Sequence, residues 1–149
     1  MNNDTALPPL YLFVSLAMMV LLHFFIPVYT VIPHPWNAVG LAPLTLGFVL
    51  NMTADATLKK HATTVKPFEE SSTLVTTGVY KYSRNPMYLG MALILIGVAI
   101  LMGSITPYIV IPGFIVIIQR VFIASEENML DEQFGNHWSS YREKVRRWL

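Results

Sequence analysis

Residues 80–102 read YKYSRNPMYLGMALILIGVAILM, and this stretch joins two chemically opposite halves. The first half carries aromatic rings, two cations and an Asn85-Pro86 step, whereas residues 86–102 contain no charged side chain. Proline is well tolerated at the first position of a helix, because the N–H that it lacks would have no partner there. The stretch therefore predicts a helix that begins at Pro86 and enters apolar surroundings, with polar groups gathered at its entrance.

The composition identifies those surroundings as a lipid bilayer. Of the 149 residues, 54% are hydrophobic and only 13% are charged, and the mean hydropathy is +0.50, which is unlike a soluble domain. A net charge of +1 gives no field that would attract nucleic acid, and the absence of cysteine excludes disulfides and thiolate chemistry. The four histidines are scattered, so we expect no metal site.

Four apolar segments are long enough, or nearly long enough, to cross a bilayer, which takes roughly 20 helical residues. They are residues 10–26, 38–58, 86–102 and 106–124, with proline or glycine between them. The first has no cationic region before it and no small-residue cleavage site after it, so we expect it to be retained. The sequence predicts an all-α membrane protein with four transmembrane helices, forming a single membrane domain over residues 1–149.

The charges indicate an orientation. Every Lys and Arg lies either in the connection 59–85 or from residue 120 onward, while residues 32–36 and 103–105 contain none. Because Lys and Arg concentrate in cytoplasmic segments, we expect both termini and the connection 59–85 to be cytoplasmic. The expected location is a bacterial or archaeal cytoplasmic membrane.

The segment 125–149 has its own pattern. Its large apolar residues recur at helical spacing, and they are Leu130, Phe134, Trp138, Tyr141, Val145 and Trp148. Gly135 and Asn136 interrupt the pattern, which predicts the end of one helix and the start of another. This cytoplasmic amphipathic tail is open to two interpretations: a basic helix lying on anionic lipid, or a lid over a site.

Several ordered motifs carry a family resemblance. They are Gly78-Val79-Tyr80, Arg84-Asn85-Pro86-Met87-Tyr88, Glu126-Glu127, and Phe134-Gly135 followed by Tyr141. In this order they resemble the isoprenylcysteine carboxyl methyltransferase and phospholipid methyltransferase group of membrane enzymes, over roughly residues 74–148. The chain departs from the group's pattern where Asn85 replaces a histidine and Trp138 stands in place of a first tyrosine.

The resemblance implies methyl transfer from S-adenosylmethionine, held at the cytoplasmic ends of the last two spans. Rings and hydroxyls suit the cofactor's sulfonium and adenine, arginine suits its carboxylate, and a glutamate suits its ammonium or ribose. The expected cofactor-binding residues are Tyr80, Tyr82, Asn85, Pro86, Tyr88, Leu89, Glu126 and Glu127. Asn85 has a structural alternative as the cap of the helix that begins at Pro86, where the amides of residues 87–89 would stay free for a ligand.

Arg84, Arg120 and Glu127 are the expected catalytic residues. Arg120 and Glu127 are seven positions apart, which places them on one face of an α-helix. An arginine at a membrane boundary usually has an acidic partner, so we expect Arg120 and Glu127 to converge with Arg84 on one pocket. The alternative is that Glu126 and Glu127 are simple surface charges at headgroup level.

The acceptor is expected to be a lipophilic small molecule or a lipid that carries a carboxylate, thiol or amine, with membrane lipids as the surrounding partners. An alternative function is a small four-helix transporter or a non-catalytic membrane subunit. The first span contains no acidic residue, which weakens the transporter alternative.

Overall fold

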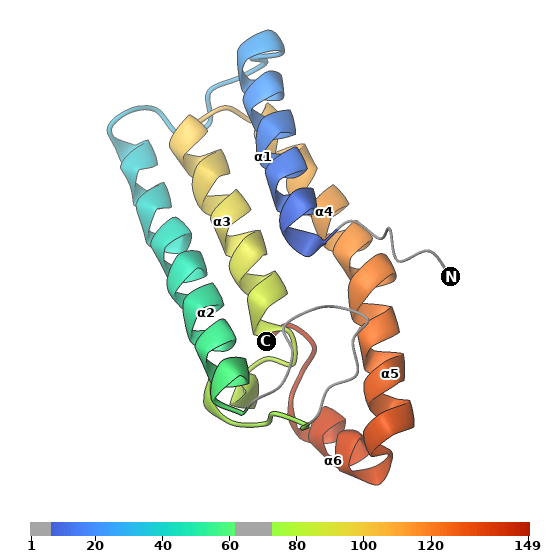
Figure 1. The fold of residues 1–149 in the computed structure, drawn as a ribbon. Helices are drawn as coiled ribbons and strands as arrows, with labels where there is room; N and C mark the ends of the chain where they lie inside the picture. The colour runs from blue at the N-terminus through green and yellow to red at the C-terminus, as the bar shows by residue number, and fades with distance from the viewer. Residues whose placement is uncertain (1–6, 62–72) are drawn as a thin grey trace.

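The computed structural model of the chain describes residues 7–61 and 73–149, and these residues fold as a bundle of helices (Figure 1). In order, the elements are α1 (Pro8–Phe25), the 3₁₀ helix η1 (Trp36–Gly40), α2 (Leu41–Lys60), the 3₁₀ helix η2 (Gly78–Lys81), α3 (Pro86–Met102), the 3₁₀ helix η3 (Thr106–Ile109), α4 (Val110–Ile118), the π-helix η4 (Gln119–Ile123), α5 (Ala124–Phe134) and α6 (Asn136–Lys144). Among the described residues the one β pairing is an isolated bridge between Thr30 and Ser104. The predicted all-α class is confirmed. Residues 62–72 of the expected cytoplasmic connection lie outside the described residues.

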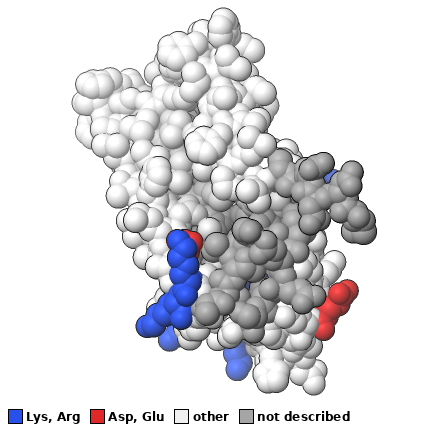
Figure 2. Space-filling view, in the orientation of Figure 1, with Lys and Arg blue, Asp and Glu red and all other residues white. Residues whose placement is uncertain are grey.

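The helices have the length and composition of membrane spans. Three helical segments are long and apolar enough to cross a bilayer, namely Pro8–Phe25, Trp36–Lys60 and Thr106–Phe134, and α3 is a shorter apolar helix of 17 residues. Figure 1 shows α1, α2, α3 and α4 side by side, and in the view of Figure 2 the Lys, Arg, Asp and Glu side chains gather in the half that contains α5 and α6. The chain is an integral membrane protein.

Helices α2 and α3 form the tightest pair in the bundle. A Cβ added at Gly47 would lie 2.5 Å from the carbonyl oxygen of Gly90, and one added at Gly97 would lie 2.6 Å from the amide nitrogen of Leu44. Only glycine permits backbones to approach this closely, as in other small-residue contacts between membrane helices. The pairing holds the start of α3, with its polar residues, against the charged end of α2.

The helix of the last apolar segment continues beyond the predicted end of the span. The sequence placed its end near residue 124, whereas one helical segment runs from Thr106 to Phe134. It ends at Gly135, whose φ of +48° few other residues adopt. Glu126 and Glu127 therefore lie inside a continuous helix, where their directions are fixed by its geometry.

The tail folds back on the bundle. Trp138, Tyr141 and Val145 form a buried cluster, against which Leu74, Leu130 and Phe134 pack, so the predicted helical spacing marks a core face. Helix α6 ends at Lys144, and in Figure 1 the C-terminus lies beside the start of α3. Of the two interpretations of the tail, the basic helix on lipid does not hold for residues 145–149, here called the C-terminal segment, because they leave the helix and turn inward.

Candidate active site

The start of α3 is bound by the C-terminal segment through its backbone. The amide of Arg84 donates to the carbonyl of Arg146 (3.0 Å), and the side-chain amide of Asn85 donates to the carbonyl of Arg147 (3.1 Å). Asn85 makes no capping bond to the helix, and the Leu89 amide donates to the Asn85 carbonyl (3.0 Å). The alternative of Asn85 as the helix cap is therefore wrong, because its side chain bonds to the C-terminal segment instead. The expected free amide at Leu89 is also wrong, because that amide makes the first bond of the helix. Pro86 is fully buried at the first helical position.

A buried ion cluster lies next to this junction. One carboxylate oxygen of Glu127 lies 3.2 Å from Nη1 of Arg84, and Arg147 donates to both oxygens from Nε (3.1 Å) and Nη2 (2.5 Å). The side chains of Glu127 and Arg84 are each only 9% exposed. Burial lowers the pKa of the Arg84 guanidinium while Glu127 opposes that shift, and the group stays cationic at neutral pH. The cluster thus holds two cations and one carboxylate.

Arg120 does not join this cluster. It is exposed, and the ion pairs of Glu127 with described residues are those to Arg84 and Arg147. The π-helix at Gln119–Ile123 explains the difference, since its extra residue rotates all that follows by about 100° relative to an uninterrupted α-helix. The expected Arg120–Glu127 face is wrong, whereas the expected approach of Arg84 to Glu127 is observed.

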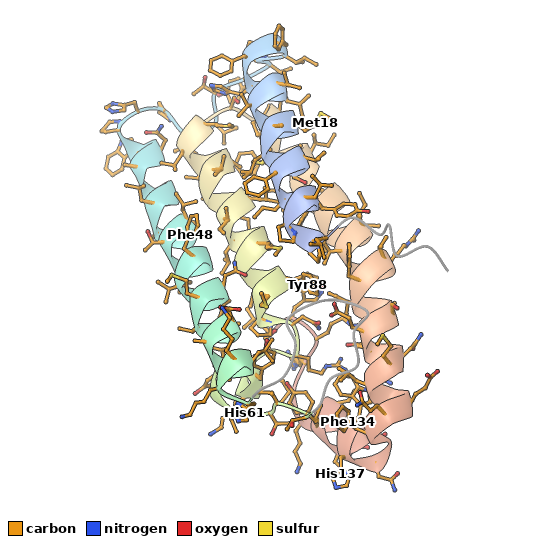
Figure 3. All side chains as sticks on the ribbon, in the orientation of Figure 1. Met18, Phe48, His61, Tyr88, Phe134 and His137 are labelled. Atoms are coloured by element: carbon orange, nitrogen blue, oxygen red, sulfur yellow. The ribbon has the colours of Figure 1, made fainter. Side chains whose placement is uncertain are left out.

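Glu126 faces a different set of groups. The hydroxyl of Tyr88 donates to its carboxylate at 2.6 Å, and the Tyr88 side chain is buried. The Tyr88 ring lies 6.3 Å from that of Phe122, which contacts Tyr11 of α1 edge-on at 5.3 Å. Figure 3 places Tyr88 between α3 and the helix that continues into α5. The two neighbouring glutamates therefore bind an aromatic hydroxyl on one side and two arginines on the other.

A cavity of about 80 Å³ is lined in part by Arg84. Its walls include Val75, Tyr80, Arg84, Leu130, Trp138 and Tyr141. The Tyr141 hydroxyl donates to the carbonyl of Tyr80 (2.7 Å), and the Arg84 guanidinium carbon lies 5.6 Å from the centre of a Trp138 ring. Burial raises the pKa of both phenols, that of Tyr141 to about 12, so both hydroxyls stay neutral near pH 7.

The structure thus brings some of the residues expected at the site together and leaves others apart. Arg84, Tyr88, Glu126 and Glu127 converge near the start of α3, with Asn85 and Pro86 at the junction, whereas Tyr82 is 74% exposed. Sequence reasoning did not name Arg147 as a site residue, and it placed Trp138 and Tyr141 in the helical pattern and in the family motif without proposing that they belong to the site. The signal for those two was available, because both occupy positions of the family motif.

The donors and acceptors of this site fit S-adenosylmethionine. Arg84 and Trp138 have buried N–H groups without a hydrogen-bond partner among the described residues, which suits the cofactor's carboxylate. Glu126 offers a carboxylate to an ammonium, and the Tyr88 ring, whose hydroxyl donates to Glu126, offers a π face to a sulfonium. No group of His, Asp and Glu among the described residues could hold a metal ion.

Comparisons with known proteins agree with this chemistry. A family model described as phospholipid methyltransferase matches residues 36–137. The chain is 38% identical over 63 residues to an uncharacterized protein of Haemophilus influenzae, covering 42% of this chain and all of that protein. It is 31% identical over 118 residues to protein-S-isoprenylcysteine O-methyltransferase B of Arabidopsis thaliana, covering 75% of this chain and 58% of the relative.

A solved structure extends the likeness to the whole chain. The eukaryotic intramembrane Ras methyltransferase, an isoprenylcysteine carboxyl methyltransferase, superposes with a TM-score of 0.67 at 25% identity, covering 100% of this chain and 53% of that one. The chain therefore spans a little over half the length of the methyltransferases that it matches here. With the matching family model over residues 36–137, this shows that the chain belongs to the phospholipid methyltransferase family of membrane proteins and has the fold of the isoprenylcysteine carboxyl methyltransferases.

Proposed function

We propose that the chain catalyses methyl transfer from S-adenosylmethionine to a lipophilic acceptor within the membrane. The observation that carries the proposal is the convergence of Arg84, Glu126 and Glu127 at the buried start of α3, where aromatic rings adjoin them. Burying charged side chains in a membrane protein is costly, so charges found there usually serve structure or function. Here their donors and acceptors match the polar groups of the proposed cofactor.

Each part of the site has a distinct task in this proposal. Arg84 and Trp138 bind the carboxylate of the cofactor or of the acceptor, and Glu126 accepts from an ammonium. Glu127 holds Arg84 in place through their ion pair. S-adenosylmethionine, when bound, supplies a methyl group made electrophilic by its sulfonium. The protein's contribution is then chiefly to place the acceptor in line with that methyl group, and such positioning supplies on the order of 7–11 kcal/mol in favourable cases.

The acceptor side is apolar. The rings of Tyr88, Phe122 and Tyr11 continue directly into the core cluster of the bundle, to which Trp148 of the C-terminal segment also belongs. Tyr88 and Phe122 are buried in this cluster, whereas Tyr11 of α1 is partly exposed. Prenylated cysteine and phospholipid headgroups are both consistent with it, since the matched relatives act on the former and the family model is described by the latter.

The acceptor's nature decides whether a base is needed. A carboxylate forms the new bond to the methyl carbon with its own lone pair as the sulfur–carbon bond breaks, and no proton moves. An amine or a thiol must lose a proton to react, and the carboxylate of Glu126 with the Tyr88 hydroxyl is the pair placed to receive it.

The proposed orientation follows the charges. We place the end that contains α5 and α6 in the cytoplasm, because the Lys and Arg side chains gather there. Labelling of single cysteines introduced at positions 34 and 104 with a membrane-impermeant reagent tests it. Labelling of both from the cytoplasmic side alone would reverse the orientation.

Cofactor binding is the direct test of the function. We expect detergent-purified protein to bind S-adenosylhomocysteine in calorimetry, and to transfer a labelled methyl group from S-adenosylmethionine to N-acetyl-S-farnesylcysteine or to phosphatidylethanolamine in vesicles. The product identifies the acceptor class. Absence of heat and of any thermal shift at millimolar ligand would overturn the proposal and favour a transporter or a non-catalytic membrane subunit.

A further inference from the structure

Arg120 is a charged residue to which the bundle gives no partner. Its side chain is exposed, and it makes no ion pair or hydrogen bond with any residue that the structure describes. The residues three and four positions away on the same helix are Val116, Ile117, Ile123 and Ala124, and none of them can pair with a cation. Any partner of Arg120 therefore lies outside the described part of the chain.

The surface around Arg120 is apolar. Arg120 belongs to the helical segment Thr106–Phe134, and residues 106–119 of that segment carry no charge. The exposed large side chains next to it on the helix are those of Val116, Ile117 and Val121. The next exposed acidic side chain along the helix is that of Asp131, which is roughly 16 Å away at the rise of an α-helix. Arg120 thus lies on a lipid-facing surface, before the helix reaches the acidic residues at its end.

The π-helix explains why Arg120 faces outward. In an uninterrupted α-helix, an arginine seven residues before Glu127 would lie on the same face as that carboxylate. The π-helix Gln119–Ile123 breaks this register, so Glu127 is buried while Arg120 stays on the surface. Single π-helical turns within α-helices occur frequently at functional sites. The local backbone therefore presents this guanidinium to lipid rather than to the ion cluster.

A lipid-facing arginine is costly unless an anion accompanies it. The bilayer offers such an anion in the phosphate of a phospholipid, to which arginine can donate two parallel N–H bonds. The stem of the side chain can lie along the apolar surface while the guanidinium reaches toward the headgroups. A free anion in water has no apolar part to hold it there, whereas the acyl chains of a phospholipid can pack on Val116 and Ile117.

We propose that Arg120 binds the phosphate of an anionic phospholipid, in the leaflet at the end of the bundle that contains α5 and α6. The acyl chains of that lipid lie along the exposed face of α4. One guanidinium meets one phosphodiester, and phosphatidylglycerol carries this charge without a cation in its headgroup. The contact goes beyond the proposed function and does not depend on it, because Arg84, Glu126 and Glu127 make their contacts inside the bundle.

The test compares Arg120→Gln with Arg142→Gln. The second variant is the matched control, since it removes the same charge from an exposed position on α6. The full-length proteins in maltoside micelles are titrated with phosphatidylglycerol, with diacylglycerol of the same chains, and with inorganic phosphate. Thermal unfolding reports binding. Diacylglycerol measures the contribution of the acyl chains alone, and inorganic phosphate that of the free anion.

We expect phosphatidylglycerol to stabilise the unmodified protein, and Arg120→Gln to need about tenfold more of this lipid for half of the effect, while Arg142→Gln needs no more. An equal change in both variants would show a general attraction between anionic lipid and a basic surface, and it would overturn the site. The site is also overturned if diacylglycerol or inorganic phosphate stabilises the unmodified protein as well as the phospholipid does, if phosphatidylglycerol has no effect, or if Arg120→Gln responds as the unmodified protein does.

If Arg120→Gln does not fold, Ala124→Glu decides. It places a carboxylate one turn from Arg120 at an exposed position, where the two side chains pair and the phosphate loses its place. Asn128→Glu is the control, because it adds the same charge at an exposed position one turn further along the helix. A weaker response to phosphatidylglycerol in Ala124→Glu alone supports the site, and any other result overturns it.

Discussion

Helices α1 and α3 are similar in length and both apolar, yet they occupy opposite environments. Of the 18 residues of α1 only Pro8, Ser15 and Met19 are buried, and large side chains such as Phe13 and Phe24 are exposed. Of the 17 residues of α3 nine are buried, among them Tyr88, Gly90, Leu95 and Gly97. Glycine and alanine let neighbouring helices close around α3, whereas the bulky surface of α1 suits lipid. Hydropathy thus places both helices in the membrane, and side-chain size shows which one lies at the centre.

The largest expected effect comes from the ion cluster at the start of α3, the central helix. Glu127→Ala should lower the free energy of unfolding by about 3–5 kcal/mol, because Arg84 and Arg147 would lose the carboxylate that they share. Glu132→Ala on the exposed side of α5 is the control and should change it by less than about 0.5 kcal/mol. Denaturation in detergent measures both. Equal stability of the two variants would show that the ion cluster contributes nothing to the fold.

The attachment of the tail to the bundle should appear as a pH dependence of the free energy of unfolding. Burial raises the pKa of the Tyr141 phenol to about 12, against about 10 in the unfolded chain. Its contribution to the free energy of unfolding is therefore complete below pH 10 and is lost as the pH rises through 12. Between pH 8 and 12 the Tyr141→Phe variant should therefore lose about 2–3 kcal/mol less of its free energy of unfolding than the unmodified protein. Unfolding curves from pH 8 to 12 measure it. A pH dependence that is the same in both proteins would refute the burial of this hydroxyl.

Helix packing gives the sharpest comparison of centre and edge. Gly47→Ala should cost about 1–3 kcal/mol, since its methyl group would meet the Gly90 backbone oxygen at 2.5 Å. Gly113→Ala is the same change on α4 with no atom within 4 Å, and it should stabilise the protein slightly because alanine favours a helix. Thermal unfolding in one detergent compares them. Loss of stability in both variants would mean that the effect is one of helix propensity or lipid contact.

The smallest predicted effect concerns the site alone. Tyr88→Phe should keep the fold and reduce cofactor affinity or rate about tenfold, because Glu126 would lose the hydroxyl that donates to it. Tyr82→Phe, in the same motif but exposed, should have no such effect. Binding of S-adenosylhomocysteine and methyl-transfer rates measure both. A larger loss in Tyr82→Phe would move the site to the outer surface of the loop.

The sequence predicted the elements better than their contacts. The helix that begins at Pro86 follows from proline and the apolar run, and the approach of Arg84 to Glu127 follows from the family motif. Arg120 was misplaced because a π-helix at Gln119–Ile123 leaves no composition signal and yet changes the register of all that follows. Arg147 was missed because it lies beyond the last helix, where no periodicity relates it to Glu127. Local rules capture helices, but they do not capture a partner brought in by an irregular segment.

The hydrogen bonds from the Arg84 backbone amide and the Asn85 side chain to the carbonyls of residues 146 and 147 also set an order of events during biosynthesis. At about 5–20 residues per second, several seconds of translation separate the start of α3 from its partners. Helix α3 is therefore synthesised before the residues that bind its N-terminal end. Until residues 146 and 147 emerge from the ribosome, the start of α3 lacks these two hydrogen bonds.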